Sequence, residues 1–311
     1  MNTEANALPP SPHETQPTVP AALSATRPMY WSVRRELWEN RSIYVAPLAA
    51  AAVFFLGFSI SRITLPHRMR ALSALDSAQQ RAAIAMPYDV AAILIIFTTL
   101  IVGVFYCLDA LHSERRDRSI LFWKSLPVSD LTTVLSKASI PLVVLPLLAF
   151  AIIVPLQLTM LLLSTAVLLA SGMSAATLWT QFRLFQESLI LLYGLTVHAL
   201  LYTPLYGWLL LLSAWARRTP FLWAVLPPLA LGAFERIAFQ TSYFGSLMKY
   251  RVMGAMAEAF VLDPGNKGHI TRLTQLNPLG FLSSSGLWIG LAAAALFLAV
   301  AVRLRRRGEP L

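Results

Sequence analysis

Charged residues are scarce in this sequence, and cysteine is almost absent. Only 13% of the 311 residues are Asp, Glu, Lys or Arg, whereas 57% are hydrophobic. The mean hydropathy of +0.62 is far from that of an ordinary soluble domain. Cys107 is the single cysteine, which excludes an intramolecular disulfide and a CxxC metal or redox motif. The composition therefore indicates a membrane protein without an intramolecular disulfide.

The sequence also lacks the motifs of common hydrolases and metal sites. It contains no GxxxxGK[ST] phosphate loop, no HExxH and no GxSxG. Five histidines are dispersed along the chain, and no two are four residues apart, as a helical metal-binding pair would require. We therefore expect no enzymatic activity, no metal and no cofactor in this chain.

The net charge of +10 does not indicate nucleic-acid binding. The basic residues are scattered over the ends of apolar segments, whereas a nucleic-acid-binding protein gathers them in one domain or on one face. Basic residues at the ends of apolar runs are typical of membrane proteins, in which they face the cytoplasm. We therefore expect a lipid bilayer, and no nucleic acid, around this chain.

Six apolar segments are long enough to cross a bilayer, which takes about 20 residues. The uncharged stretch 138–182 is too long for one straight helix, and we interpret it as a long kinked helix followed by an outer loop. Pro204 is expected to bend the fourth span. The sequence thus predicts an all-α polytopic membrane protein with six transmembrane helices, at 42–62, 89–110, 138–166, 188–216, 219–240 and 283–304.

The basic clusters also predict the orientation of the chain. With six spans and a cytoplasmic amino terminus, the largest clusters fall on the cytoplasmic side. One exception is the group after the first span, with Arg62, His67, Arg68 and Arg70. We expect both termini in the cytoplasm, together with Arg34, Arg35 and Arg41, the block 115–137, Arg217 and Arg218, and Arg303, Arg305, Arg306 and Arg307.

Two segments precede the first span. Residues 1–27 hold five prolines among polar residues without apolar periodicity, which predicts a disordered tail. Residues 28–41 have helical periodicity, with an apolar arc and two tryptophans one heptad apart beside it. This pattern predicts a helix in the membrane interface, although a plain juxtamembrane anchor would have the same geometry. The apolar arc holds Met29, Tyr30, Val33 and Leu37, and the opposite arc holds Arg35, Glu36 and Glu39.

The segment 111–137 between the second and third spans combines charged and aromatic residues. Glu114 and Asp117 stand among arginines, and the apolar pair Phe122 and Trp123 follows, before a Ser-Leu-Pro turn. A signal for orientation alone requires neither the acidic residues nor the aromatic pair. We interpret the segment as a docking element for a cytoplasmic partner, with apolar anchors and charged steering. The alternative is that its charges only set the orientation.

Polar residues in the fourth and fifth spans are candidates for a transport path. His198, Tyr202 and Tyr206 recur every four residues and share one helical face. Such residues line a polar path or form hydrogen bonds between helices, and both interpretations stay open. Glu235 and Arg236 end the fifth span. They predict either a re-entrant or exofacial helical pair in the outer helical region 241–282, or a short span whose end lies in the headgroups.

The run 106–137, YCLDALHSERRDRSILFWKSLPVSDLTTVLSK, resembles the first cytoplasmic loop of bacterial type-2 ABC exporter permeases. These are six-span subunits that act with a separate ATPase. The matching residues are Asp109 to Leu111, Glu114 to Ser119 and Phe122 to Pro127. The match covers about 30 residues, and the expected topology of six spans agrees with it over the rest of the chain.

This resemblance implies the permease subunit of an ATP-driven exporter in the bacterial inner membrane. Its coupling helix, between spans two and three, would dock on the ATPase, and residues 28–41 would be the connecting helix, with Trp31, Arg34, Arg35 and Trp38. Two ATPase copies would bind ATP and magnesium, and a second permease, identical or homologous, would complete the path. The docking residues would be Glu114, Arg115, Arg116, Asp117, Arg118, Ser119, Phe122, Trp123, Lys124, Leu126 and Pro127.

Two other classes of protein remain as alternatives. A non-transporting membrane anchor or assembly subunit would have much the same sequence features. A secondary transporter, which calls for inverted repeats and paired intramembrane charges, is less favoured, because the two halves show no internal repeat.

Overall fold

The computed structural model describes residues 26–72, 76–117, 128–251, 256–261, 270 and 272–307. These residues are almost entirely helical, and they contain one isolated β-bridge, Phe260–Leu276, but no strand. Six helical segments within them are long and apolar enough to cross a membrane. The predicted all-α fold with six membrane-spanning helices is therefore confirmed.

The helices follow the predicted order along the chain, and several spans consist of consecutive helical pieces. The pieces are α1 (Thr26–Glu39); α2 (Ser42–Ser61), η1 (Arg62–Thr64) and α3 (Leu65–Leu72); α4 (Ser77–Asp109) and α5 (His112–Arg116); α7 (Asp130–Ser139), η2 (Ile140–Val144) and α8 (Leu145–Ala170); α9 (Ala176–Gln181) and α10 (Leu184–Trp215); α11 (Pro220–Ala238), α12 (Tyr243–Lys249), α13 (Met256–Ala259), η4 (Leu273–Gln275), α14 (Pro278–Ser283) and α15 (Ser285–Arg307).

The third span is one long helical segment, Asp130–Ala170. Its irregular part is η2, a π-helical turn that contains Pro141. Proline has no N–H and cannot donate to the carbonyl four residues earlier, and π-turns commonly occur as single-turn insertions inside α-helices. Pro155, by contrast, lies within α8 without ending it.

The second span starts well before its predicted beginning at residue 89. The α4 helix begins at Ser77, where the Asp76 side chain accepts a hydrogen bond from Gln79 N at 2.7 Å as an N-cap. A helix of 33 residues is about 50 Å long, which exceeds the roughly 30 Å hydrocarbon thickness of a bilayer. Hydropathy therefore located the membrane part of the helix and missed its polar extension.

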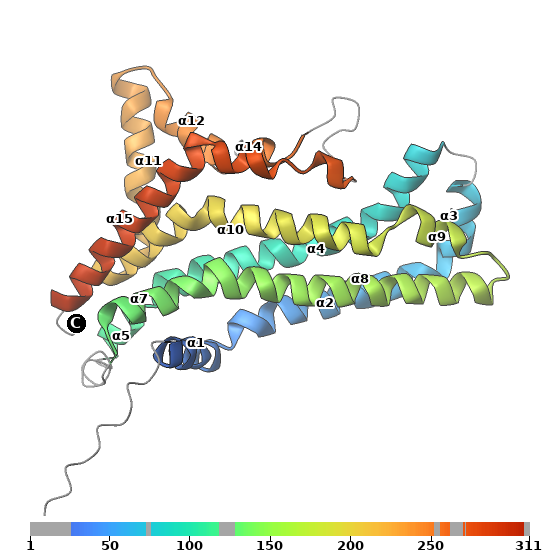
Figure 1. Ribbon diagram of the computed structural model, residues 1–311, viewed down its shortest axis with the longest axis horizontal. Coiled ribbons are helices and arrows are strands. Elements are labelled where there is room, and N and C mark those ends of the chain that lie inside the picture. Colours follow the sequence, from blue (N-terminus) through green and yellow to red (C-terminus); the bar gives the residue numbers. More distant parts are fainter. Residues whose placement is uncertain are drawn as a thin grey trace, which may run out of the picture.

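Four long helices, α2, α4, α8 and α10, run side by side and form the main bundle (Figure 1). The α15 helix packs along α10, and small residues allow their close approach. A Cβ atom on Gly207 would lie 3.3 Å from the Cα atom of Ala294. Small residues at such contacts are typical of helix packing in membranes.

A helical hairpin of α11 and α12 stands apart from this bundle (Figure 1). Only 6% of the apolar window of α11 is buried within the chain. Gln240, with a φ of 52°, lies in the turn that leads α12 back onto α11. The structure thus pairs the fifth span itself, α11, with the short α12, and it places Glu235 and Arg236 in the last turn of α11.

The two ends of the bundle differ in their helices and in their charged side chains. At one end lie α1, α5, α7 and the carboxyl-terminal end of α15, whereas α3 and α9 lie at the other (Figure 1). The α1 helix is seen nearly end-on while α2 runs across the view, so α1 lies across the direction of the bundle. The first of these ends holds most of the charged side chains that the sequence singled out.

Candidate functional site: a buried ion network

Six charged side chains from four helices meet at this end of the bundle. Three are acidic and three are basic, so their formal charges cancel. Four of them, Glu36, Glu114, Lys137 and Arg305, have side chains no more than 5% exposed. We call this group the ion network, and its members are Arg35 and Glu36 of α1, Glu114 of α5, Asp130 and Lys137 of α7, and Arg305 of α15.

Lys137 and Glu114 are the central members of the ion network. The ammonium nitrogen of Lys137 lies 2.8 Å from Glu36 Oε1 and 3.1 Å from Glu114 Oε1. Arg305 Nη1 donates to Glu114 Oε2, and Arg305 Nε donates to Asp130 Oδ1 at 3.1 Å. Arg35 Nη2 lies 3.2 Å from both glutamates. Each buried glutamate therefore contacts basic side chains from two or three helices.

The ion network also includes a hydroxyl of the second span. Tyr106 OH of α4 donates to Glu36 Oε2 at 2.8 Å, and this tyrosine is buried beside the sole cysteine. Buried charges persist only when they are paired and hydrogen-bonded. Glu36 meets this condition through Lys137, Arg35 and Tyr106.

A second set of contacts fastens α5 to the end of α10. Ser213 Oγ accepts hydrogen bonds from Leu111 N at 2.9 Å and His112 N at 3.0 Å. Arg115 Nη1 donates to the carbonyl of Ala214 at 2.7 Å. These bonds satisfy N–H groups at the start of one helix and a carbonyl at the end of another, which have no partner within their own helices. The short α5 helix is thus held by α10 on one side and by the ion network on the other.

The two helices that border residues 118–127 are therefore tied to the rest of the bundle. The α5 helix precedes this segment and α7 follows it. Through the ion network and Ser213, both are linked to α1, α4, α10 and α15.

The predicted docking residues have different positions in the structure. Arg116 and Asp117 are exposed and pair with each other at 3.0 Å, while Arg115 is half-buried. Glu114 is buried, so its predicted contact with a partner disagrees with the structure. Its carboxylate faces α7 and α15, where three basic side chains surround it. Outside the described residues lie Arg118, Ser119, Phe122, Trp123, Lys124, Leu126 and Pro127.

The predicted connecting helix has one outward and one inward face. Trp31 and Trp38 are exposed, and the Arg34 guanidinium lies over both rings, 5.2 and 4.7 Å from their centroids, in a cation–π arrangement. Arg35 points instead into the ion network.

The placement of Glu36 on the polar arc of this helix was wrong. Glu36 is 2% exposed and faces the bundle. It stands seven residues after Met29 and three after Val33, so at 3.6 residues per turn it borders the apolar arc. Its burial follows from this position, because the apolar arc of α1 packs against the bundle.

The candidate path residues fall into two separate places. On α10, the rings of His198 and Tyr202 stack with centroids 4.1 Å apart, and Tyr206 is buried against Gly103, where an added Cβ would lie 3.3 Å from the tyrosine ring. Glu235 instead accepts hydrogen bonds from residues 241–244 at the start of α12. The structure thus brings the three α10 residues together and places Glu235 elsewhere.

Only weak sequence signals point to the residues of this site that were not predicted. Lys137 is a lone charge directly before 45 uncharged positions, 138–182, and it was interpreted only as part of a basic flank. A single lysine at such a border is a candidate for a buried partner. The missed members are Glu36, Tyr106, Asp130, Lys137, Ser213 and Arg305.

Comparison with known proteins adds no relative: no protein-family model, curated protein or solved structure matches the chain. Among the described residues, no group of three or more His, Cys, Asp or Glu side chains is arranged to hold a metal ion.

Proposed function

We propose that the chain is the permease subunit of an ATP-driven exporter, and that residues 111–137 receive the movement of a separate ATPase subunit. The resemblance of residues 106–137 to exporter permeases motivates this proposal. One structural observation carries it: the helices on both sides of residues 118–127 are locked into the bundle by the ion network.

The ion network suits the transmission of force. A partner that displaces only a flexible loop does not move distant helices. A partner that displaces α5 and α7 also moves the helices that the ion network joins to them. Because separated buried charges are costly, Glu114, Lys137 and Arg305 keep their contacts and move together. The displacement therefore reaches α8, which continues from α7, and α15, which carries Arg305.

Charge supports the cytoplasmic orientation of this end. Several exposed arginines surround the ion network at helix ends, and basic residues near spans face the cytoplasm in bacterial membrane proteins. The chain would then lie in the bacterial inner membrane with both termini inside and act with two ATPase subunits and a second permease. The exposed arginines are Arg34, Arg41, Arg116, Arg217, Arg218, Arg303, Arg306 and Arg307.

Copurification tests the docking proposal. The chain is purified from its native membrane, bound ATPases are labelled with a photoreactive ATP analogue, and the labelled subunit is then coexpressed with variants. We expect Phe122→Ala with Trp123→Ala to lose the labelled subunit, since truncation of anchor residues costs about 1–4 kcal/mol of binding. Trp288→Ala, at an exposed tryptophan of α15, serves as the control. Normal recovery with the double variant overturns the docking proposal.

Reconstitution distinguishes transport from anchoring. In liposomes, an exporter hydrolyses ATP faster when its substrate is present, whereas a non-transporting anchor binds the ATPase without this stimulation. Screening hydrolysis by the reconstituted complex against classes of amphiphile and polysaccharide therefore separates the two functions. A complex whose ATPase rate responds to no addition favours the anchor.

Cysteine labelling tests the orientation. On a Cys107→Ala background, cysteines at the exposed positions Asp117 and Arg306 are expected to react only from the cytoplasm, and one at Asp76 only from outside. Reaction of Asp117→Cys from outside the cell contradicts the proposed topology.

A further inference from the structure

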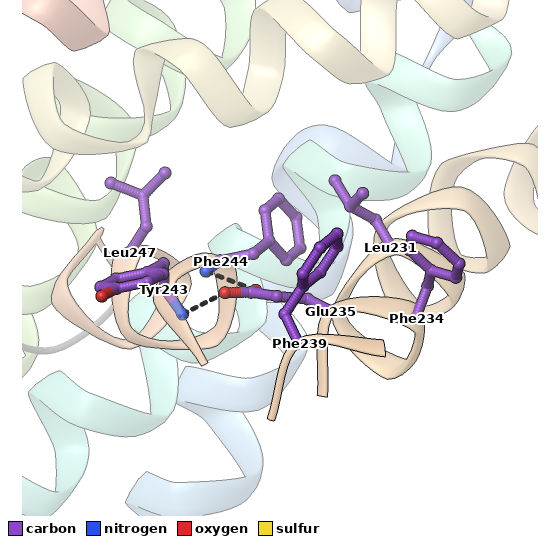
Figure 2. A pocket seen from close by; sticks show the side chains of 7 residues that line it. All are labelled: Leu231, Phe234, Glu235, Phe239, Tyr243, Phe244 and Leu247. Atoms are coloured by element: carbon purple, nitrogen blue, oxygen red, sulfur yellow. Dashed lines mark hydrogen bonds between the residues drawn. The ribbon is translucent and has the colours of Figure 1, made fainter. Parts of the chain in front are cut away.

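An open groove with a volume of about 550 Å³ lies between α11 and α12 (Figure 2). Known small-molecule sites have volumes of about 300–1,000 Å³. Six of the seven lining residues are apolar or aromatic, and the seventh is Glu235. The lining residues are Leu231, Phe234, Glu235, Phe239, Tyr243, Phe244 and Leu247.

The carboxylate of Glu235 is held in a fixed position by the start of α12. Its Oε1 accepts a hydrogen bond from Tyr243 N at 2.5 Å, and its Oε2 accepts one from Phe244 N at 2.8 Å (Figure 2). Oε1 also accepts a hydrogen bond from Thr241 Oγ1 at 3.0 Å. An ionised carboxylate offers about four acceptor positions, so one remains beside the groove. No basic side chain is among the lining residues.

Aromatic rings in the groove offer further contacts for a cation. Four of the lining side chains are aromatic, and the rings of Phe234 and Phe239 meet edge-to-face with centroids 6.1 Å apart. The faces of such rings attract ammonium groups, and cages of aromatic rings are a common way to bind them. A fixed carboxylate beside aromatic rings therefore favours an ammonium ion over a neutral or anionic group.

We propose that this groove binds a membrane phospholipid whose headgroup carries an ammonium group. The source is the bilayer because the helix that forms one wall is apolar and almost unburied. Phe234 is 60% exposed and Ile237 is 81% exposed, and in a membrane-spanning chain such residues face lipid chains. The ammonium group lies between the Glu235 carboxylate and the aromatic rings, and an acyl chain lies along Leu231 and Leu247. This site is independent of the proposed ATPase partner.

Native mass spectrometry of the full chain in detergent tests the proposal. The probes are dioleoyl phosphatidylethanolamine, dioleoyl phosphatidylcholine and dioleoyl phosphatidylglycerol, which share acyl chains and differ in headgroup. We expect either ammonium lipid to bind about tenfold more tightly than phosphatidylglycerol, as a carboxylate combined with cation–π contacts permits. Equal affinity for all three lipids overturns the proposal.

Two variants locate the binding in the groove. Glu235→Gln removes the charge, keeps one oxygen acceptor for the α12 N–H groups and replaces the other oxygen with an NH2 group. Phe239→Leu removes one ring and keeps an apolar side chain. Each is expected to lower the affinity for the ammonium lipids by about threefold to tenfold without lowering the affinity for phosphatidylglycerol. The matched control is Phe221→Leu, an exposed aromatic position of α11 outside the groove. Unchanged preference in both groove variants contradicts the proposal.

A soluble probe distinguishes the source of the ligand. Dodecyltrimethylammonium has the same chemistry but does not belong to the bilayer. Displacement of phosphatidylethanolamine by this compound in the wild-type protein, and weaker displacement in Phe239→Leu, supports a shared groove. If dodecyltrimethylammonium binds with this dependence while the phospholipids do not, the occupant is a free amphiphile and the lipid proposal is wrong. Circular dichroism of each variant establishes that the helices remain folded.

Discussion

Glutamates hold helices together in two regions of this molecule, and they do so in opposite ways. In the ion network, Glu114 contacts basic side chains that are far from it in sequence, up to 191 residues away. In the hairpin, Glu235 bonds only 6 to 9 residues ahead. The first arrangement links distant spans, and the second fixes one local turn. The comparison indicates that the ion network joins several helices into one unit, whereas the Glu235 contacts stay within the hairpin.

Burial follows the same division. The charged groups of the ion network are surrounded by helices, so each depends on its partners for compensation. The hairpin exposes apolar side chains along most of α11, and its stability depends on few contacts with the bundle. Substitutions in the two regions should therefore differ in the size and the reach of their effects.

The largest effect is expected for Lys137→Met. The substitution keeps an unbranched chain of similar length and leaves Glu36 and Glu114 without their shared ammonium group. Removal of one partner from a buried ion pair costs about 3–5 kcal/mol. The free energy of unfolding, measured by denaturant titration in detergent, should fall by this amount. Lys249→Met, at an exposed lysine in the last turn of α12, is the control and should have almost no effect.

A combined substitution shows whether this loss comes from uncompensated charge. Glu36→Gln and Glu114→Gln each remove one acidic charge from around Lys137. If Lys137→Met with Glu114→Gln is as unstable as Lys137→Met alone, the loss reflects packing and the electrostatic account of the ion network is wrong.

The six spans and the helix at 28–41 were predictable from the sequence, because length, apolar content and helical period determine them. The pairing of Lys137 with Glu36 was not. Hydropathy places Lys137 at the border of an apolar stretch, and only the packing of α1 against α7 shows that its ammonium group faces protein and not water.

The helical period gave partial information about the site. It placed Glu36 near Met29 and Val33, which would have indicated burial, but three neighbouring charged residues favoured the polar interpretation. It also placed His198, Tyr202 and Tyr206 correctly on one face, although the neighbours of that face depend on tertiary structure. The contact of the Glu235 carboxylate with the start of α12 depends on the turn at Gln240. This turn could not be predicted, because Gln240, and not a glycine, occupies its positive-φ position.

A smaller effect is expected for Tyr106→Phe, which removes one hydrogen bond to Glu36 and keeps the ring. Hydrogen bonds to charged groups contribute about 1.5–3 kcal/mol. A double-mutant cycle with Glu36→Gln should show that the two losses do not add, because they report the same contact. Additive losses would mean that the hydroxyl stabilises the protein through another group.

His198→Leu and Tyr202→Phe sharpen the comparison at α10, which is packed against both α4 and α15. If the stacked pair serves only packing, His198→Leu lowers stability by about 0.5–1.5 kcal/mol, as expected for the loss of an aromatic pair, and Tyr202→Phe, which keeps the ring, lowers it less. Transport per folded complex should then be unchanged. A change in substrate-stimulated ATPase activity with unchanged stability assigns the pair to the path instead.

The smallest effect on overall stability is expected for Glu235→Ala, although its local effect is clear. The substitution removes the acceptor for Tyr243 N and Phe244 N, so the first turn of α12 loses its cap. Hydrogen exchange of the amides in 243–249 should become several-fold faster, because this local opening involves only the hairpin.

The amides of α5 and α7 should keep their protection, since the ion network is unaffected. Glu235→Gln should retain part of the protection of α12, because its amide oxygen still accepts a hydrogen bond from one of the two N–H groups. Faster exchange in α5 or α7 after Glu235→Ala would show that the hairpin and the ion network are coupled, and the separation of the two regions would then be wrong.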